Sequence, residues 1–83
     1  MDHIAIYIQP FVLKQVVGVH SNGECIKFVE CKMSDVAPTC LALCKEFDIH
    51  QVDLGGSTPF AEKIKDKIIE TNFDNFHVNV DIH

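Results

Sequence analysis

The sequence contains no arginine, and lysine supplies all seven of its basic side chains. Twelve aspartates and glutamates outnumber them, so the formal net charge at pH 7 is −5. Arginine is the side chain that makes forked contacts to phosphate and to guanine. We therefore expect no nucleic-acid partner for this chain.

Long apolar runs are also missing. No stretch of about 18 unbroken apolar residues occurs, as a membrane-spanning helix requires. The chain does not open with a basic segment followed by an apolar run and a small-residue cleavage site, the pattern of an export signal. We therefore expect a cytoplasmic protein without a membrane partner.

The motifs of common catalytic and cofactor sites are absent too. No G-x-S-x-G segment is present, and no glycine-rich segment ends in the Gly-Lys-Ser/Thr of a P-loop. The cysteines are not arranged in the C-x2-C pairs of zinc knuckles. We predict no catalytic residue, no metal ligand and no cofactor. Without an export signal the cysteines are expected to be reduced thiols, mostly in the core. They are Cys25, Cys31, Cys40 and Cys44.

The length indicates one domain, residues 1–83. A chain of 83 residues buries only about 60 % of the surface that its unfolded form exposes. Two independent cores are therefore excluded, and the apolar content of 47 % suits a single core.

The first third of the sequence predicts three consecutive strands. Residues 3–9 alternate, with isoleucines at positions 4, 6 and 8 on one face. Pro10 interrupts this pattern, and a second β-rich run covers residues 11–20. Asn22-Gly23 then supplies the positive φ angles of a tight hairpin turn, so residues 25–32 are the returning strand.

Two helices and two strands are predicted in the remainder. Ser34 or Asp35 caps a helix that runs to about Phe47, with Pro38 in its first turn. Residues 49–54 form a short buried strand. Thr58 caps a second helix, with Pro59 as its first residue, and residues 72–75 end it. Residues 76–82 form the last strand, whose polar outward stripe is expected to be a solvated strand edge. This stripe consists of His77, Asn79, Asp81 and His83.

The element order is thus βββ-α-β-α-β, which predicts an α/β (α+β) fold with a single mixed five-stranded sheet. Connections between parallel strands are right-handed in nearly all proteins. With the first strand central, the strand order is 3-2-1-4-5 and both helices cover one face. The opposite face of the sheet has no helix to cover it.

This element order resembles the ribonuclease-H-like fold, three meandering strands followed by αβαβ. The resemblance extends from Ile4 to Ile82 and concerns order and length only. Nucleases of that family carry a catalytic aspartate in the first strand, where this chain has Ile6, Tyr7 and Ile8. The resemblance therefore implies the scaffold without the metal-dependent chemistry.

The second predicted strand is apolar on both of its sides, which is typical of a strand buried on both faces. We therefore expect the uncovered face to be apolar and to bind a second copy of the chain or another protein. The role expected on size alone is that of a small accessory protein of a bacterium or phage. The expected interface residues are Phe11, Leu13, Val17 and Val19, with Tyr7 and Phe28 as neighbours.

Two alternative functions remain open. The segment Gly55, Gly56, Ser57 and Thr58 lies between a strand and a helix N-terminus, where free N–H groups favour an anion. It predicts a site for a phosphorylated small molecule. A divergent nuclease is the third candidate, with Asp53 as the carboxylate nearest to the place where that chemistry would occur.

Overall fold

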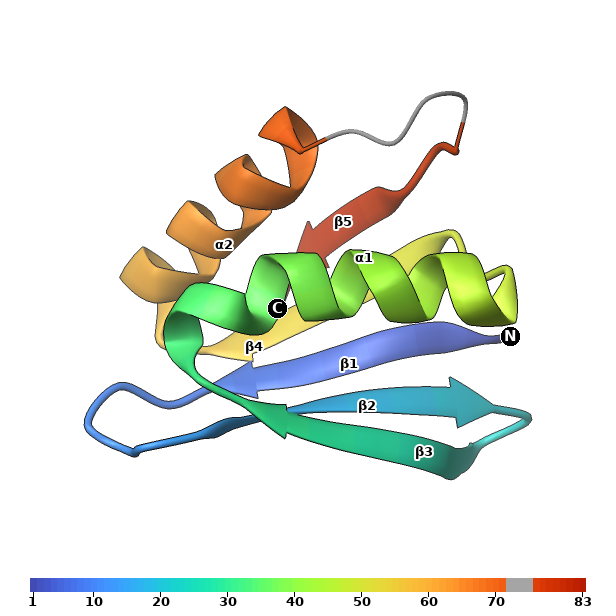
Figure 1. Ribbon diagram of the computed structural model, residues 1–83, viewed down its shortest axis with the longest axis horizontal. Helices are drawn as coiled ribbons and strands as arrows, with labels where there is room; N and C mark the ends of the chain where they lie inside the picture. Colours follow the sequence, from blue (N-terminus) through green and yellow to red (C-terminus); the bar gives the residue numbers. More distant parts are fainter. Residues whose placement is uncertain (72–75) are drawn as a thin grey trace.

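The computed structural model describes residues 1–71 and 76–83, and it contains the five-stranded sheet and the two helices expected from the sequence (Figure 1). The elements are β1 (His3–Ile8), β2 (Gln15–Ser21), β3 (Glu24–Cys31), the 3-10 turn η1 (Met33–Asp35), α1 (Val36–Phe47), β4 (Gln51–Gly56), α2 (Thr58–Glu70) and β5 (Asn79–Ile82). The predicted end of the second helix at residues 72–75 lies outside the described residues.

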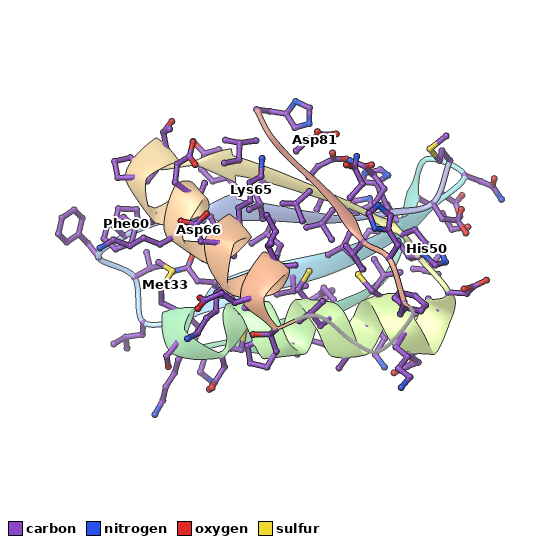
Figure 2. All side chains as sticks on the ribbon, turned by 90° about the horizontal axis from the view of Figure 1, so that it is seen from above. Met33, His50, Phe60, Lys65, Asp66 and Asp81 are labelled. Atoms are coloured by element: carbon purple, nitrogen blue, oxygen red, sulfur yellow. The ribbon has the colours of Figure 1, made fainter. Side chains whose placement is uncertain are left out.

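The strand order is β3-β2-β1-β4-β5, as predicted. The first three strands pair antiparallel, whereas β1, β4 and β5 pair parallel through the two helical crossovers. Figure 2 shows α1 and α2 on the same side of the sheet, with Asp81 on the other. The sheet is therefore mixed, and within residues 1–71 and 76–83 both helices cover the same face.

The hairpin between β2 and β3 follows the Asn-Gly signal. Asn22 and Gly23 have φ angles of 54° and 81°, and Ser21 pairs with Glu24 on either side of the turn. Two consecutive residues with positive φ match the right-handed twist of the flanking strands. This short-range prediction is confirmed.

Several predicted boundaries differ from the structure. Ser57 is the N-cap of α2 and Thr58 is its first residue. Asp35, one of the two predicted caps, is the N-cap of α1 and also the last residue of the 3-10 turn, but its side chain makes no capping hydrogen bond. The fourth strand begins two residues later than predicted and includes both glycines, because Ile8 of β1 pairs with Gly56. The last strand begins at Asn79 instead of Phe76.

The second strand differs most, since β2 begins at Gln15 and not at Phe11. The buried amide of Gln15 donates to the Gln9 carbonyl at 2.7 Å and accepts from the Gln9 N–H at 2.8 Å. These bonds close a loop between β1 and β2, here called the β1–β2 loop (residues 9–14). Phe11 and Leu13 lie in this loop and not on the sheet.

The expected position of Val17 and Val19 on the uncovered face is wrong. Val17 pairs with Ile6 and Val19 with Ile4, and residues directly opposite in an antiparallel pair share a face. All four side chains are buried in the core beneath the helices. The alternation counted from Phe11 assigned the wrong face, because Phe11 and Leu13 are not part of the strand.

Candidate functional site: the uncovered sheet face

The strand register places one row of residues across the uncovered face. Phe28 is opposite Gly18, Gly18 is opposite Ala5, and Ala5 is opposite Asp53. Asp53 is in turn opposite Asp81. In this row the face is therefore apolar over β3, β2 and β1 and acidic over β4 and β5, while His3, His20 and Glu30 are the polar residues that the register adds to the first three strands. The expectation of an apolar uncovered face is corrected to the part over β3, β2 and β1, since β4 and β5 place Asp53 and Asp81 on it.

A shallow groove of about 600 Å³ lies where the two halves meet. Its volume falls within the range of about 300–1,000 Å³ that is usual for ligand-binding clefts. Small residues at Ala5, Gly18 and Gly55 leave space between larger side chains of the neighbouring strands. The larger residues that line the groove include Tyr7, Val16, His20, Phe28, Asp53 and His83.

Gly18 matters because of its neighbour on the same strand. A Cβ atom at position 18 would lie 3.1 Å from Nε2 of His20. The His20 ring stacks on that of His3, with centroids 5.1 Å apart and an interplanar angle of 7°. Glycine at this position therefore leaves room for a pair of stacked imidazoles at one end of the groove.

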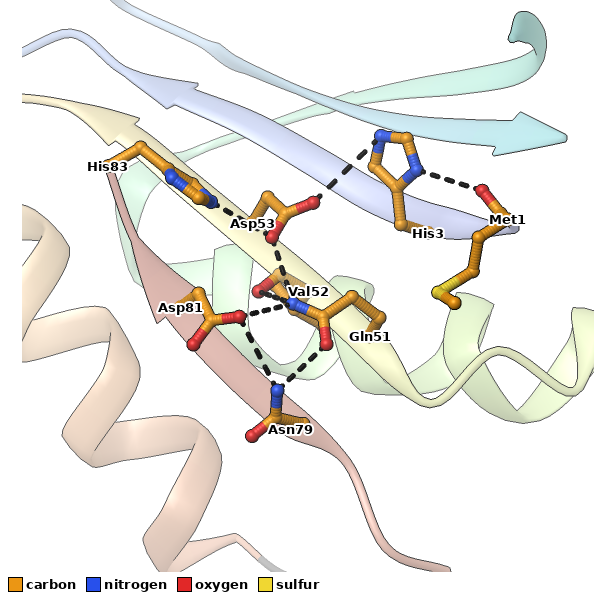
Figure 3. A network of polar contacts seen from close by, with 8 residues as sticks. All are labelled: Met1, His3, Gln51, Val52, Asp53, Asn79, Asp81 and His83. Carbon is orange, nitrogen blue, oxygen red and sulfur yellow. Dashed lines mark hydrogen bonds and ion pairs between the residues drawn. The ribbon is translucent and has the colours of Figure 1, made fainter. Parts of the chain in front are cut away.

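A network of polar side chains occupies β4 and β5 (Figure 3). The Gln51 amide Nε2 donates to Asp53 Oδ1 at 2.9 Å and to Asp81 Oδ2 at 2.8 Å. Asn79 Nδ2 donates to Gln51 Oε1 at 2.8 Å. One amide group thus bridges two carboxylates on adjacent strands, so these carboxylates already have hydrogen-bond donors.

Two imidazoles also approach Asp53. His83 Nε2 lies 3.1 Å from Oδ1 of Asp53, and His3 Nε2 lies 4.0 Å from its Oδ2. Partial burial raises the pKa of Asp53, but the bonds from Gln51 and His83 and the nearby imidazoles outweigh it and hold the pKa below its usual value. Within residues 1–71 and 76–83, no group of three or more Asp, Glu, His or Cys side chains has an arrangement that could hold a metal ion.

His50 connects the end of α1 to the segment before β5. Its Nδ1 donates to the His77 carbonyl at 2.6 Å, its Nε2 lies 3.1 Å from Asp48 Oδ1, and its ring stacks on Phe76. The bond to the His77 carbonyl and the contact with the Asp48 carboxylate raise the pKa of His50 above 6.5. Asp48 has a φ of 54° at the helix C-cap, a conformation that asparagine also adopts readily.

We predict that Asp48→Asn lowers the pKa of His50. The substitution removes the negative charge but suits the left-handed backbone, so the fold should be retained. Because the folded-state pKa is raised, the contribution of His50 to stability is complete below about pH 6.5 and is lost as the pH rises through the folded-state pKa. An NMR titration of the His50 ring protons measures the change. An unaltered titration midpoint in the variant would contradict the assigned role of Asp48.

The predicted interface residues divide into three groups. Tyr7 and Phe28 line the groove on the uncovered face. Phe11 and Leu13 are fully exposed, but in the β1–β2 loop. Val17 and Val19 are in the core. The groove residues that sequence reasoning missed are Ala5, Val16, Gly18 and His20. The available signal was the alternation of β1 for Ala5 and the alternation of β2 from Gln15 onward for the other three.

In the predicted anion-binding segment, the packing of the fold accounts for Gly56 and Ser57. A Cβ atom on Gly56 would lie 2.2 Å from the Ile8 carbonyl oxygen, so glycine is required where β4 meets β1. The Ser57 N–H donates to that same carbonyl at 3.0 Å, and the Ser57 carbonyl accepts from Ala61. Gly55 lines the groove and Thr58 begins α2. Binding of a phosphorylated molecule at this segment stays a prediction.

All four cysteines are free thiols in the structure. Cys40 and Cys44 are buried one helical turn apart in α1. The hydrogen bond with Cys44, together with burial, raises the pKa of the Cys40 thiol. A neutral thiol in the core is consistent with a packing role for Cys40. Cys25 is exposed and Cys31 is half-buried on β3.

Comparisons with protein-family models, with curated proteins and with solved structures found no match to this chain. Among the residues that the structure describes, neither helix is long and apolar enough to span a bilayer.

Proposed function

We propose that this chain is a non-enzymatic interaction module that self-associates through the apolar half of its uncovered sheet face. The observation that supports the proposal is the exposure of two aromatic side chains beside the groove. Tyr7 is 67 % exposed and Phe28 is 64 % exposed. Aromatic side chains that enter well-packed pockets supply much of the binding energy in protein interfaces.

The surroundings of these aromatic residues support the same proposal. Val16 is 44 % exposed and lines the same groove as Tyr7 and Phe28. A contiguous apolar patch next to polar side chains is typical of protein–protein interfaces. The polar network around Asp53 and Asp81 would then border the contact.

We expect the wild-type chain to have a mass of at least twice 9.3 kDa in light scattering. Tyr7→Asp should lower this mass to 9.3 kDa, because association would bury an unpaired carboxylate. The exposure of Tyr7 means that the monomer fold should be retained, which circular dichroism checks.

Ile69→Asp provides the matched control. Ile69 is 58 % exposed, similar to Tyr7, but belongs to α2 on the covered side of the sheet. This variant should keep the wild-type mass. A wild-type chain that remains at 9.3 kDa at high concentration would overturn the proposal, and so would an equal loss of mass in both variants.

A further inference from the structure

Two apolar side chains project from the β1–β2 loop, whose two ends are joined by the hydrogen bonds between Gln15 and Gln9. Phe11 and Leu13 are fully exposed, whereas the Gln15 amide that closes the loop is buried. Phe11 has a φ of 74°, a left-handed conformation that is rare for a bulky residue. Strained backbone conformations cluster at functional sites. The exposed side chain of Phe11 adds nothing to the core, so the strain at this residue points to a role outside folding.

The groove has the shape and chemistry to receive these two side chains. Its floor consists of Ala5, Gly18 and Gly55, and Tyr7 and Phe28 rise beside it. Pairs of aromatic rings and contacts of leucine with aromatic rings both fit such a groove. The loop does not occupy the groove of its own copy, since Phe11 and Leu13 are fully exposed there.

Charges on the loop and around the groove are complementary. Lys14 follows Leu13 and is the first lysine in the sequence; the next is Lys27. Asp53 lines the groove. Glu30 is opposite Val16, another groove residue, so it shares that face of the sheet. A loop seated in the groove would bring Lys14 toward these carboxylates, which favours the correct partner and orientation.

We infer that the β1–β2 loop of one copy seats Phe11 and Leu13 in the groove of a second copy. This inference rests on the proposed self-association and names the two surfaces that meet. The loop and the groove are different surfaces of the same chain. The contact is therefore either made reciprocally in a twofold dimer or made head to tail, in which case it closes into a ring or continues as a chain of copies. The hydrogen bonds between Gln15 and Gln9 already restrict the loop in the free chain, so less conformational entropy is lost when the loop binds.

A mixing experiment tests this pairing. A loop variant carries Phe11→Asn and Leu13→Asn, because asparagine removes the apolar groups and tolerates the backbone conformation at position 11. A groove variant carries Tyr7→Asp. Each variant alone should have a mass of 9.3 kDa in light scattering. An equimolar mixture should contain a heterodimer, because the loop variant retains a groove and the groove variant retains a loop.

The outcomes separate this inference from the proposed function. A loop variant that keeps the wild-type mass, while the groove variant is monomeric, would leave self-association through the face intact and overturn the role of the loop. An equimolar mixture that stays at 9.3 kDa at the highest soluble concentration would also overturn the loop-in-groove contact. A monomeric wild-type chain would overturn both proposals.

Discussion

Gly56→Ala should destabilise the fold by about 2–5 kcal/mol. The methyl group would be placed 2.2 Å from the Ile8 carbonyl oxygen and 2.8 Å from the Ile8 nitrogen, both backbone atoms that cannot move independently. Crowding of this kind costs about 1–3 kcal/mol, and the φ of 87° adds about 1–2 kcal/mol for a residue with a side chain. A domain of this size has a total stability of only about 4–12 kcal/mol.

Gly23→Ala is the matched control for this prediction. Gly23 has a φ of 81°, nearly the same as Gly56, but no atom lies within 4 Å of an added Cβ. It should therefore lose only the conformational part, about 1–2 kcal/mol. Urea unfolding of both variants measures the difference. Equal losses would show that β1 and β4 do not approach as closely at Gly56 as the structure indicates.

Val17→Asp should leave the chain largely unfolded or insoluble. Val17 is 0 % exposed in the core beneath the helices, and a buried unpaired carboxylate costs about 4 kcal/mol or more. The neighbouring substitution Val16→Asp should cost the monomer only about 1–2 kcal/mol, since Val16 is 44 % exposed on the uncovered face and the added charge is opposite Glu30. Adjacent residues of one strand thus report on opposite faces of the sheet.

Threonine provides a milder version of the same comparison. Val17→Thr buries one hydroxyl group and should cost about 1–3 kcal/mol, whereas Val16→Thr should be close to neutral. Thermal or urea unfolding measures both. Greater damage from the substitutions at position 16 would mean that the two faces of β2 are assigned in reverse.

Local sequence signals were enough to predict the class of fold. The isoleucine alternation in β1, the Asn-Gly turn and the proline positions in the helices each act within a few residues. Together with the handedness of parallel crossovers, they gave the strand order and the covered face. Strand boundaries were less well predicted where pairing with a distant residue decides them. For example, β4 continues to Gly56 because Gly56 pairs with Ile8 of β1.

The candidate site depended on tertiary structure to a greater degree. Phe11 and Leu13 continue the alternation of β2 in the sequence, yet the Gln15 side chain takes the backbone partners that a longer strand would need. That side-chain bond decides where β2 begins and therefore which of its residues belong to the loop.

The sequence alone determined that this chain forms one mixed sheet with two helices on one side, because hydrophobic periodicity and turn residues act over short distances. Only the tertiary structure decided which side chains reach the uncovered face. That choice depends on register, and a shift of one residue moves a side chain from core to surface. The register of β2 is set by its pairing with the buried isoleucines of β1, which lie more than ten positions away in the sequence.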